Sequence, residues 1–168
     1  MTPTVVPNRR VLEFRSLRGC EKQPVREFYD HLSPRTRYLR FFSPMPVLPD
    51  SVLNLIACGD DQQHLTLLAQ VPGERASEIV AVGNIGPSDD GAAELALVVR
   101  DDYQRQGIGT ALASNILSAA EARGVDRFVA FVLWENVTVI RKLLAHVADM
   151  VSARMHRGIA EMHFVPRR

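Results

Sequence analysis

The chain has few cysteines, few lysines and no long apolar run. Cys20 and Cys58 are far apart and lack CxxC spacing, so we expect free thiols, with a bridge or metal pair less favoured. No apolar run approaches the roughly 20 residues that span a bilayer, and the polar start lacks the apolar core of a signal peptide. These absences predict a cytoplasmic protein without a membrane partner.

The chain also lacks an excess of either charge. A formal net charge of +1 gives no electrostatic reason to expect nucleic acid. Its 168 residues, 46% of them hydrophobic, suffice for one well-packed domain and are few for two. We therefore expect a flexible lead-in over residues 1–10 and a single domain over 11–168, with a homodimer left open.

Strand and helix patterns alternate along the sequence. Period-two or continuous apolar runs predict strands at 11–15, 64–71, 78–85, 94–99, 127–134, 150–156 and 159–165. Helical spacing with capping or proline starts predicts helices at 24–32, 33–42, 50–57, 108–123 and 136–146. The apolar run at 94–99 suits a central strand that is covered on both faces. This mixture predicts one α+β domain built on a mixed sheet.

The most informative segment is Gln104-Arg105-Gln106-Gly107-Ile108-Gly109-Thr110, which stands between the apolar run ending at Val99 and a helical pattern. A helix start leaves backbone N–H groups unpaired and carries the positive end of the helix dipole, so it attracts phosphate. The two glycines remove Cβ atoms that would keep an anion away. A plain turn is the alternative. No Gly-Lys-Ser/Thr follows, which argues against a Walker-type nucleotide site.

The stretch from Glu94 to Gly124, followed by Trp134-Glu135-Asn136, resembles the acetyl-CoA core of the Gcn5-related N-acetyltransferase (GNAT) superfamily. The family pattern Gln/Arg-x-x-Gly-x-Gly/Ala is met by Gln104, Gly107 and Gly109. The resemblance implies a three-layer α/β/α fold with a splayed central strand pair, and an enzyme that uses acetyl-CoA.

Residues 32–42 are similar to the helix before the core in Pat-type bacterial protein lysine acetyltransferases. That similarity implies a protein lysine as acceptor, with a small amine as the next candidate. Pat-type domains are often fused to regulatory regions, for which 168 residues leave no room.

The resemblance also implies roles for individual residues in binding acetyl-CoA. Val98 and Val99 lie where a family bulge would free main-chain groups for the pantetheine amides. Asn136 is expected to bond the pantetheine chain, and an N-cap is a compatible alternative. The residues expected to offer backbone N–H groups to the pyrophosphate are Arg105, Gln106, Gly107, Ile108, Gly109 and Thr110.

Acetyl transfer to an amine requires a base, because an ammonium is not nucleophilic. Glu94 is our candidate, since a carboxylate in an otherwise apolar strand is costly to bury unless it has a partner or a catalytic role. Many GNAT enzymes carry a catalytic glutamate at this place. The alternative is a solvated residue at the start of a strand.

The sequence departs from the family pattern at the general acid. Leu143 stands where many GNAT enzymes carry a tyrosine that protonates the departing thiolate, so solvent would supply that proton. The missing tyrosine keeps a rival function open, a GNAT-like module that binds acyl-CoA without catalysis. Four scattered histidines share no ligand spacing and predict no metal site: His64, His146, His156 and His163.

Overall fold

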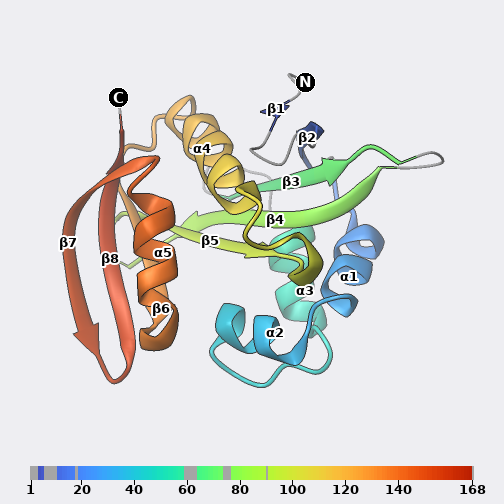
Figure 1. Ribbon diagram of the computed structural model, residues 1–168, viewed down its shortest axis with the longest axis horizontal. Helices are drawn as coiled ribbons and strands as arrows, with labels where there is room; N and C mark the ends of the chain where they lie inside the picture. Colours follow the sequence, from blue (N-terminus) through green and yellow to red (C-terminus); the bar gives the residue numbers. More distant parts are fainter. Residues whose placement is uncertain are drawn as a thin grey trace.

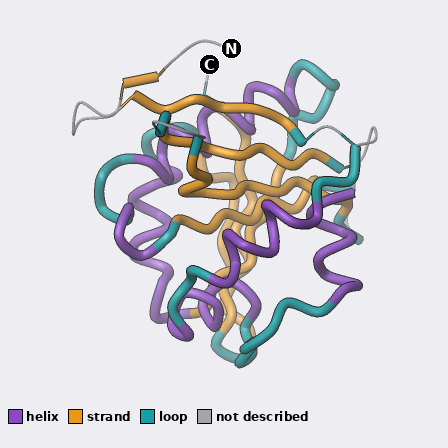
Figure 2. Tube along the Cα trace, turned by 90° about the vertical axis from the view of Figure 1, so that its right-hand side faces the viewer, coloured by secondary structure: helices purple, strands orange, loops and turns teal. Residues whose placement is uncertain are grey.

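The computed structural model describes residues 4–5, 11–17, 19–58, 64–73, 77–89 and 91–167. Over these ranges, helices lie on both faces of one eight-stranded sheet (Figures 1 and 2). The strands are β1 (Thr4–Val5), β2 (Val11–Ser16), β3 (Leu65–Val71), β4 (Glu78–Pro87), β5 (Ala93–Val99), β6 (Phe128–Leu133), β7 (Ala148–His156) and β8 (Ile159–Pro166). The α-helices are α1 (Lys22–Asp30), α2 (Pro34–Phe41), α3 (Asp50–Cys58), α4 (Ile108–Glu121) and α5 (Val137–Leu144). The expected mixed α+β architecture is confirmed.

The sheet runs in the order β1-β2-β3-β4-β5-β6-β8-β7, and its pairing changes in the middle. Neighbours from β1 to β5 are antiparallel, as are β6 with β8 and β8 with β7. The central strands β5 and β6 are parallel and pair only at Ala93 with Phe128 and at Glu94 with Val129. Beyond Glu94 the two strands separate, which confirms the expected splayed pair. The pairing of β4 with β5 is continuous through Val98 and Val99. Strand β5 therefore separates from β6 without the bulge that we expected there.

Two apolar cores lie on opposite faces of the sheet. Under α4, buried residues of that helix such as Leu112 and Ile116 pack with Phe128 of β6. On the other face, helices α1 and α3 pack over the sheet, where Val98 is buried. Strand β5 serves both cores because successive side chains point to opposite faces. This arrangement is the three-layer α/β/α fold that the resemblance implied.

The cysteines differ from the sequence-based expectation. Cys20, just before α1, and Cys58, at the end of α3, form a disulfide with Cα atoms 4.2 Å apart. The prediction of free thiols was wrong because it rested on spacing, whereas packing of α1 beside α3 brings the two positions together.

The expected lead-in contributes one short strand. Thr4–Val5 forms β1 and pairs with the start of β2, and the rest of residues 1–10 lies outside the described residues. Among the described helices, none is long and apolar enough to cross a membrane.

Candidate active site

The loop before α4 forms a cradle of backbone groups. Arg105 (φ 58°) and Gly107 (φ 82°) both adopt left-handed conformations, and Gly107 is the N-cap of the helix. Helical bonding begins where Ala111 N–H donates to Gly107 O at 3.0 Å, so the N–H groups of residues 108–110 have no partner within the helix. The helix start therefore offers unpaired donors at its positive end, as an anion site requires.

The glutamines of this loop hold its shape. Gln104 Nε2 donates to Val99 O at 3.0 Å and to Thr36 Oγ1 at 3.2 Å. Gln106 Nε2 donates to Asp102 O at 3.0 Å. Both amides thus point back into the protein, and Gln104 ties the end of β5 to α2.

Strand β5 presents alternate backbone groups to the gap between β5 and β6. Arg100 N–H donates to Val80 O on β4, whereas Ala93 N–H donates to Arg127 O on the β6 side. Because antiparallel pairing alternates along a strand, Leu97 and Val99 direct their backbone groups toward the gap, and Val98 directs its own toward β4. Sequence reasoning proposed Val98 and missed Leu97, although the two-residue strand period carries that information.

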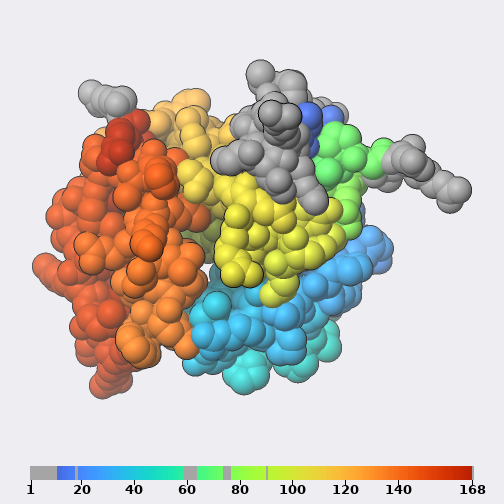
Figure 3. Space-filling model, viewed as in Figure 1, coloured from blue at the N-terminus to red at the C-terminus, as the bar shows by residue number. Residues whose placement is uncertain are grey.

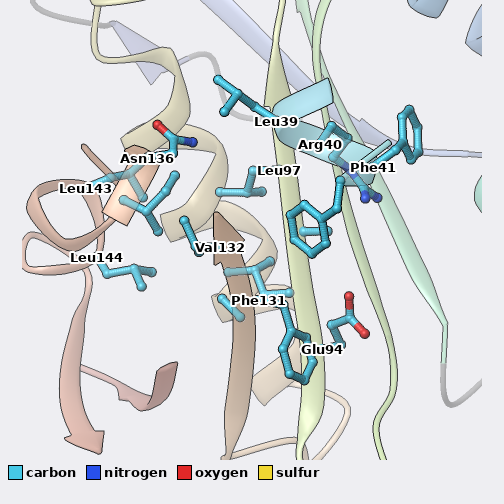
Figure 4. Close-up of a pocket in the computed structure, with 15 residues that line it drawn as sticks. Leu39, Arg40, Phe41, Glu94, Leu97, Phe131, Val132, Asn136, Leu143 and Leu144 are labelled. Carbon is cyan, nitrogen blue, oxygen red and sulfur yellow. The ribbon is translucent and has the colours of Figure 1, made fainter. Parts of the chain in front are cut away.

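A cavity of about 270 Å³ passes through this gap. Residues of α2 line it from one face of the sheet and residues of α5 from the other (Figure 4). Figure 3 shows the surface hollowed where α2, α5 and the loop before α4 meet. The residues that line it are Leu39, Arg40, Phe41, Phe42, Glu94, Leu95, Ala96, Leu97, Ala130, Phe131, Val132, Asn136, Ile140, Leu143 and Leu144.

On the α5 side the cavity is lined by Asn136, an expected site residue, and by Leu143, which stands in place of the usual tyrosine. Asn136 is the N-cap of α5, but its side chain makes no capping hydrogen bond, so the amide is available to a ligand. Leu143 also lines the cavity and packs on the α4 start, since a Cβ built on Gly109 would lie 3.0 Å from Leu143 Cδ1. The position expected for a tyrosine acid therefore faces the cavity with an apolar side chain.

Glu94 stands at the point where β5 and β6 separate. It is the last β5 residue to pair with β6, and its half-buried side chain makes no hydrogen bond or ion pair with another described residue. Glu94 also lines a second cavity, of about 220 Å³. That cavity is enclosed by Arg40, Leu55, Ile56, His64, Thr66, Asn84, Ile85, Gly86, Pro87, Glu94 and Ala96. The carboxylate is thus shared by two adjoining cavities.

Asp101, in the turn after β5, fixes helix α2 beside the gap. Its carboxylate accepts hydrogen bonds from Ser33 N–H (2.9 Å), Ser33 Oγ (2.6 Å) and Thr36 Oγ1 (2.7 Å). Ser33 in turn caps α2 by accepting from Thr36 N–H at 3.1 Å, with Pro34 at the first helical position, as the sequence predicted. Partial burial raises the pKa of Asp101, but the bonds from Ser33 and Thr36 outweigh it and hold the pKa below its usual value.

The histidines do not assemble. His64 lies in the second cavity, whereas His163 contacts Glu161 on β8, with Nε2 and Oε1 2.7 Å apart. Across the described ranges there is no group of three or more His, Cys, Asp or Glu side chains placed to hold a metal ion.

Comparison with known proteins agrees with this geometry. The family model described as Acetyltransferase (GNAT) family matches residues 25–146. The chain belongs to the GNAT family. A curated relative, Acetyltransferase PA5475 of Pseudomonas aeruginosa, is 28% identical over 111 residues, which cover 66% of this chain and 60% of the relative. Membership confirms the expected acyltransferase class, while the matched region spans only about 60% of that relative's length.

Solved GNAT structures share the fold. The GNAT domain of S. lividans PAT superimposes with a TM-score of 0.85 at 24% identity, covering 98% of this chain and 96% of that domain. The yncA acetyltransferase of Salmonella typhimurium, solved with acetyl-CoA, gives a TM-score of 0.67 at 16% identity and covers 91% of each chain. A cAMP-binding acyltransferase of Mycobacterium smegmatis, at 23% identity and a TM-score of 0.63, matches 99% of this chain with 47% of its own length.

Proposed function

We propose that this GNAT protein is an N-acetyltransferase that transfers acetyl from acetyl-CoA to a primary amine, with a protein lysine as the first candidate acceptor. One observation carries the proposal. Leu143 lines the cavity between β5 and β6 and packs on Gly109 at the α4 start, and Glu94 lies in the wall of the same cavity without a partner. The lysine assignment rests on the similarity of residues 32–42 to Pat-type enzymes.

The residues present fit acetyl-CoA. The backbone of residues 108–110 suits the pyrophosphate, because unpaired N–H groups at a helix start bind anions. The gap-facing backbone of Leu97 and the N–H of Val99, together with the Asn136 amide, suit the pantetheine chain, whereas Val99 O already accepts from Gln104. The yncA protein, which shares the fold, was solved with acetyl-CoA, and this supports the same donor here. We place the thioester near Glu94, where the strands part.

The chemistry follows from these positions. Glu94 removes a proton from the acceptor ammonium, directly or through one water, and the neutral amine attacks the thioester carbonyl carbon. An N–C bond forms, the nitrogen gives its second proton to solvent, the C–S bond breaks, and CoA leaves as the thiolate. Because Leu143 cannot donate a proton, the thiolate takes one from solvent, while Glu94 releases its proton to water.

A small amine is a second candidate acceptor, and the second cavity favours it. At about 220 Å³ this cavity has room for a small amine, and Glu94 lines it directly. A free small molecule in this cavity would present its amine to the same carboxylate.

Replacing Glu94 by Gln tests the proposal. CoA release is measured against a pool of lysine peptides and a panel of amines, and acetyl-CoA binding is measured by calorimetry. We expect Glu94→Gln to lower turnover by about 10²- to 10⁴-fold, the usual contribution of a general base, while acetyl-CoA still binds. The matched control is Glu121→Gln, an exposed position at the end of α4, which should change turnover by less than about twofold.

Tight acetyl-CoA binding by the unaltered protein, with no turnover on any acceptor, would contradict the proposal. That result would instead support the rival function, a module that binds acyl-CoA without catalysis.

A further inference from the structure

Arg40, near the end of α2, is a half-buried cation that no carboxylate pairs with among the described residues. Its polar neighbour is the Tyr29 hydroxyl: burial raises the pKa of that hydroxyl, and the charge of Arg40 and its hydrogen bond oppose the rise. The Nε of Arg40 is buried and has no hydrogen bond. The guanidinium lies 5.0 Å from the centre of the Phe41 ring, a cation–π contact that compensates only partly for lost hydration. A half-buried guanidinium with unused donors is suited to bind an anion.

The position of Arg40 indicates where that anion would bind. Arg40 lines both the cavity in the strand gap and the second cavity, and Glu94 lines the same two (Figure 4). The opposite charges of these side chains form no ion pair, although they share two cavity walls. A ligand with both a negative and a positive group would complement the two side chains at once.

Asn84 adds a second unpaired acceptor to the wall of the second cavity. Thr66 Oγ1 donates its only hydrogen to Ile56 O at 2.8 Å, so it must accept from Asn84 Nδ2 at 2.7 Å. This fixes the amide orientation and leaves Asn84 Oδ1 buried without a donor. Asn84 Oδ1 is enclosed by protein, so the Glu94 carboxylate is the acceptor that a ligand in the cavity meets, and a carboxylate suits an ammonium rather than an anion.

We infer that the acceptor carries an anionic group close to its amine, with the anion bound by Arg40 and the ammonium received by Glu94. This inference rests on the proposed function and specifies its substrate class. Leu55, Ile56 and Ile85 give the second cavity an apolar wall, which suits an acceptor with an apolar side. Two kinds of acceptor carry an anionic group close to an amine. One is a small amino acid with its own carboxylate, and the other is a peptide in which an acidic residue stands beside a lysine.

The first experiment compares matched acceptors on the unaltered protein. One pair is leucine and leucine amide, and the other is a lysine peptide with glutamate or glutamine next to the lysine. We expect at least about a tenfold higher kcat/KM for the anionic member of one pair, the factor that a charge-assisted contact provides. The pair that shows the preference identifies the source. Equal kcat/KM values within both pairs would overturn the inference and leave the proposed function standing.

The second experiment assigns the preference to Arg40. In Arg40→Gln, the ratio of kcat/KM for the anionic and neutral acceptors should fall to about one, mainly through KM for the anionic acceptor. Arg40→Lys keeps the charge but loses the planar fork, so it should restore part of the preference and guards against a folding defect in the first variant. Arg35→Gln is the matched control, because Arg35 lies on the same helix and pairs with Glu135 at 2.8 Å. A preference that survives in Arg40→Gln would overturn the assignment.

A binding measurement separates this inference from the proposed function. With CoA present, leucine should raise the melting temperature of the unaltered protein more than leucine amide does, and Arg40→Gln should abolish the difference. Discrimination in binding without turnover on any acceptor would support the inference while contradicting the proposed transferase activity. If neither turnover nor binding distinguishes the acceptors, the inference is wrong.

Discussion

The two sides of Glu94 are built in different ways. The side that we propose for the donor, the gap between β5 and β6 with the start of α4, offers mainly backbone groups. The side that we propose for the acceptor, the second cavity, consists of side chains from α2, α3, β3, β4 and β5. We call these the donor side and the acceptor side. Glu94 belongs to both sides.

This difference determines which amino-acid substitutions each side can tolerate. Backbone N–H groups remain available as hydrogen-bond donors when most side chains change, provided that the left-handed conformation of Gly107 is preserved. A cavity made of side chains changes its chemistry with a single substitution, for example at Arg40. We therefore expect donor binding to tolerate most substitutions and acceptor binding to depend on the particular side chains of this chain.

The largest expected effect is on the stability of the acceptor side. The disulfide closes a loop across a sequence separation of 38 residues around α1 to α3, and Cys58→Ser should lower the free energy of unfolding by about 4 kcal/mol on the chain-entropy model. Acetyl-CoA affinity should change little, because the donor side lies outside that loop. Urea denaturation with and without reductant measures the effect, and Cys20→Ser should reproduce it. If reductant does not change the urea midpoint of the unaltered protein, the two cysteines are free thiols, as their spacing predicted.

The next effect should break the donor side alone. Thr110 is the third residue of α4, where Asp stabilises a helix through its dipole but would repel a bound pyrophosphate. Thr110→Asp should weaken acetyl-CoA binding by about 100-fold or more while leaving the melting temperature equal or higher. Calorimetry and thermal unfolding measure the two quantities. Thr110→Asn, neutral and of similar size, is the control, and equal weakening in both variants would contradict the phosphate site.

The residues of the proposed donor side could be selected from the sequence because their signals are local. Two glycines at a strand-to-helix junction and an asparagine at the next junction are properties of short segments, and the structure places Gly107, Gly109 and Asn136 around the gap. The structure changes one residue of this prediction, because the backbone groups of Leu97, and not those of Val98, face the gap. That orientation depends on the pairing of β4 with β5 rather than on residue type.

The acceptor side was not predictable in the same way. Ser33 and Pro34 correctly predicted the start of α2. No local signal, however, indicates that Asp101 accepts hydrogen bonds from Ser33, which lies 68 residues earlier in the chain. The position of Arg40 beside both cavities and the bond between Cys20 and Cys58 likewise follow from how α1, α2 and α3 pack. Such contacts depend on tertiary packing, which periodicity and capping rules do not describe.

The smallest expected effect concerns Asp101, which joins the two sides by holding α2 beside the donor loop. Asp101→Asn keeps the shape but weakens the bonds from Ser33 and Thr36, so we expect a loss of about 1 kcal/mol in unfolding free energy at pH 7 and a higher KM for the acceptor. Denaturation curves and acceptor titrations measure these changes. Unchanged acceptor KM would show that α2 does not depend on this carboxylate for its position.

The pH dependence of this loss gives a sharper test of Asp101. Its pKa is lowered in the folded protein, because hydrogen bonds from Ser33 and Thr36 outweigh the opposing effect of burial. A lowered pKa stabilises the fold above the unfolded value of about 3.9, and the contribution disappears as pH falls through the folded pKa. The stability difference between the unaltered protein and Asp101→Asn should therefore be constant from pH 7 to about 5 and shrink below about 4. Glu78 and Asp102 also have lowered pKa values beside Arg100, but they are present in both proteins and largely cancel in the difference. A difference that persists unchanged at pH 3 would mean that the charge of Asp101 does not hold α2 in place.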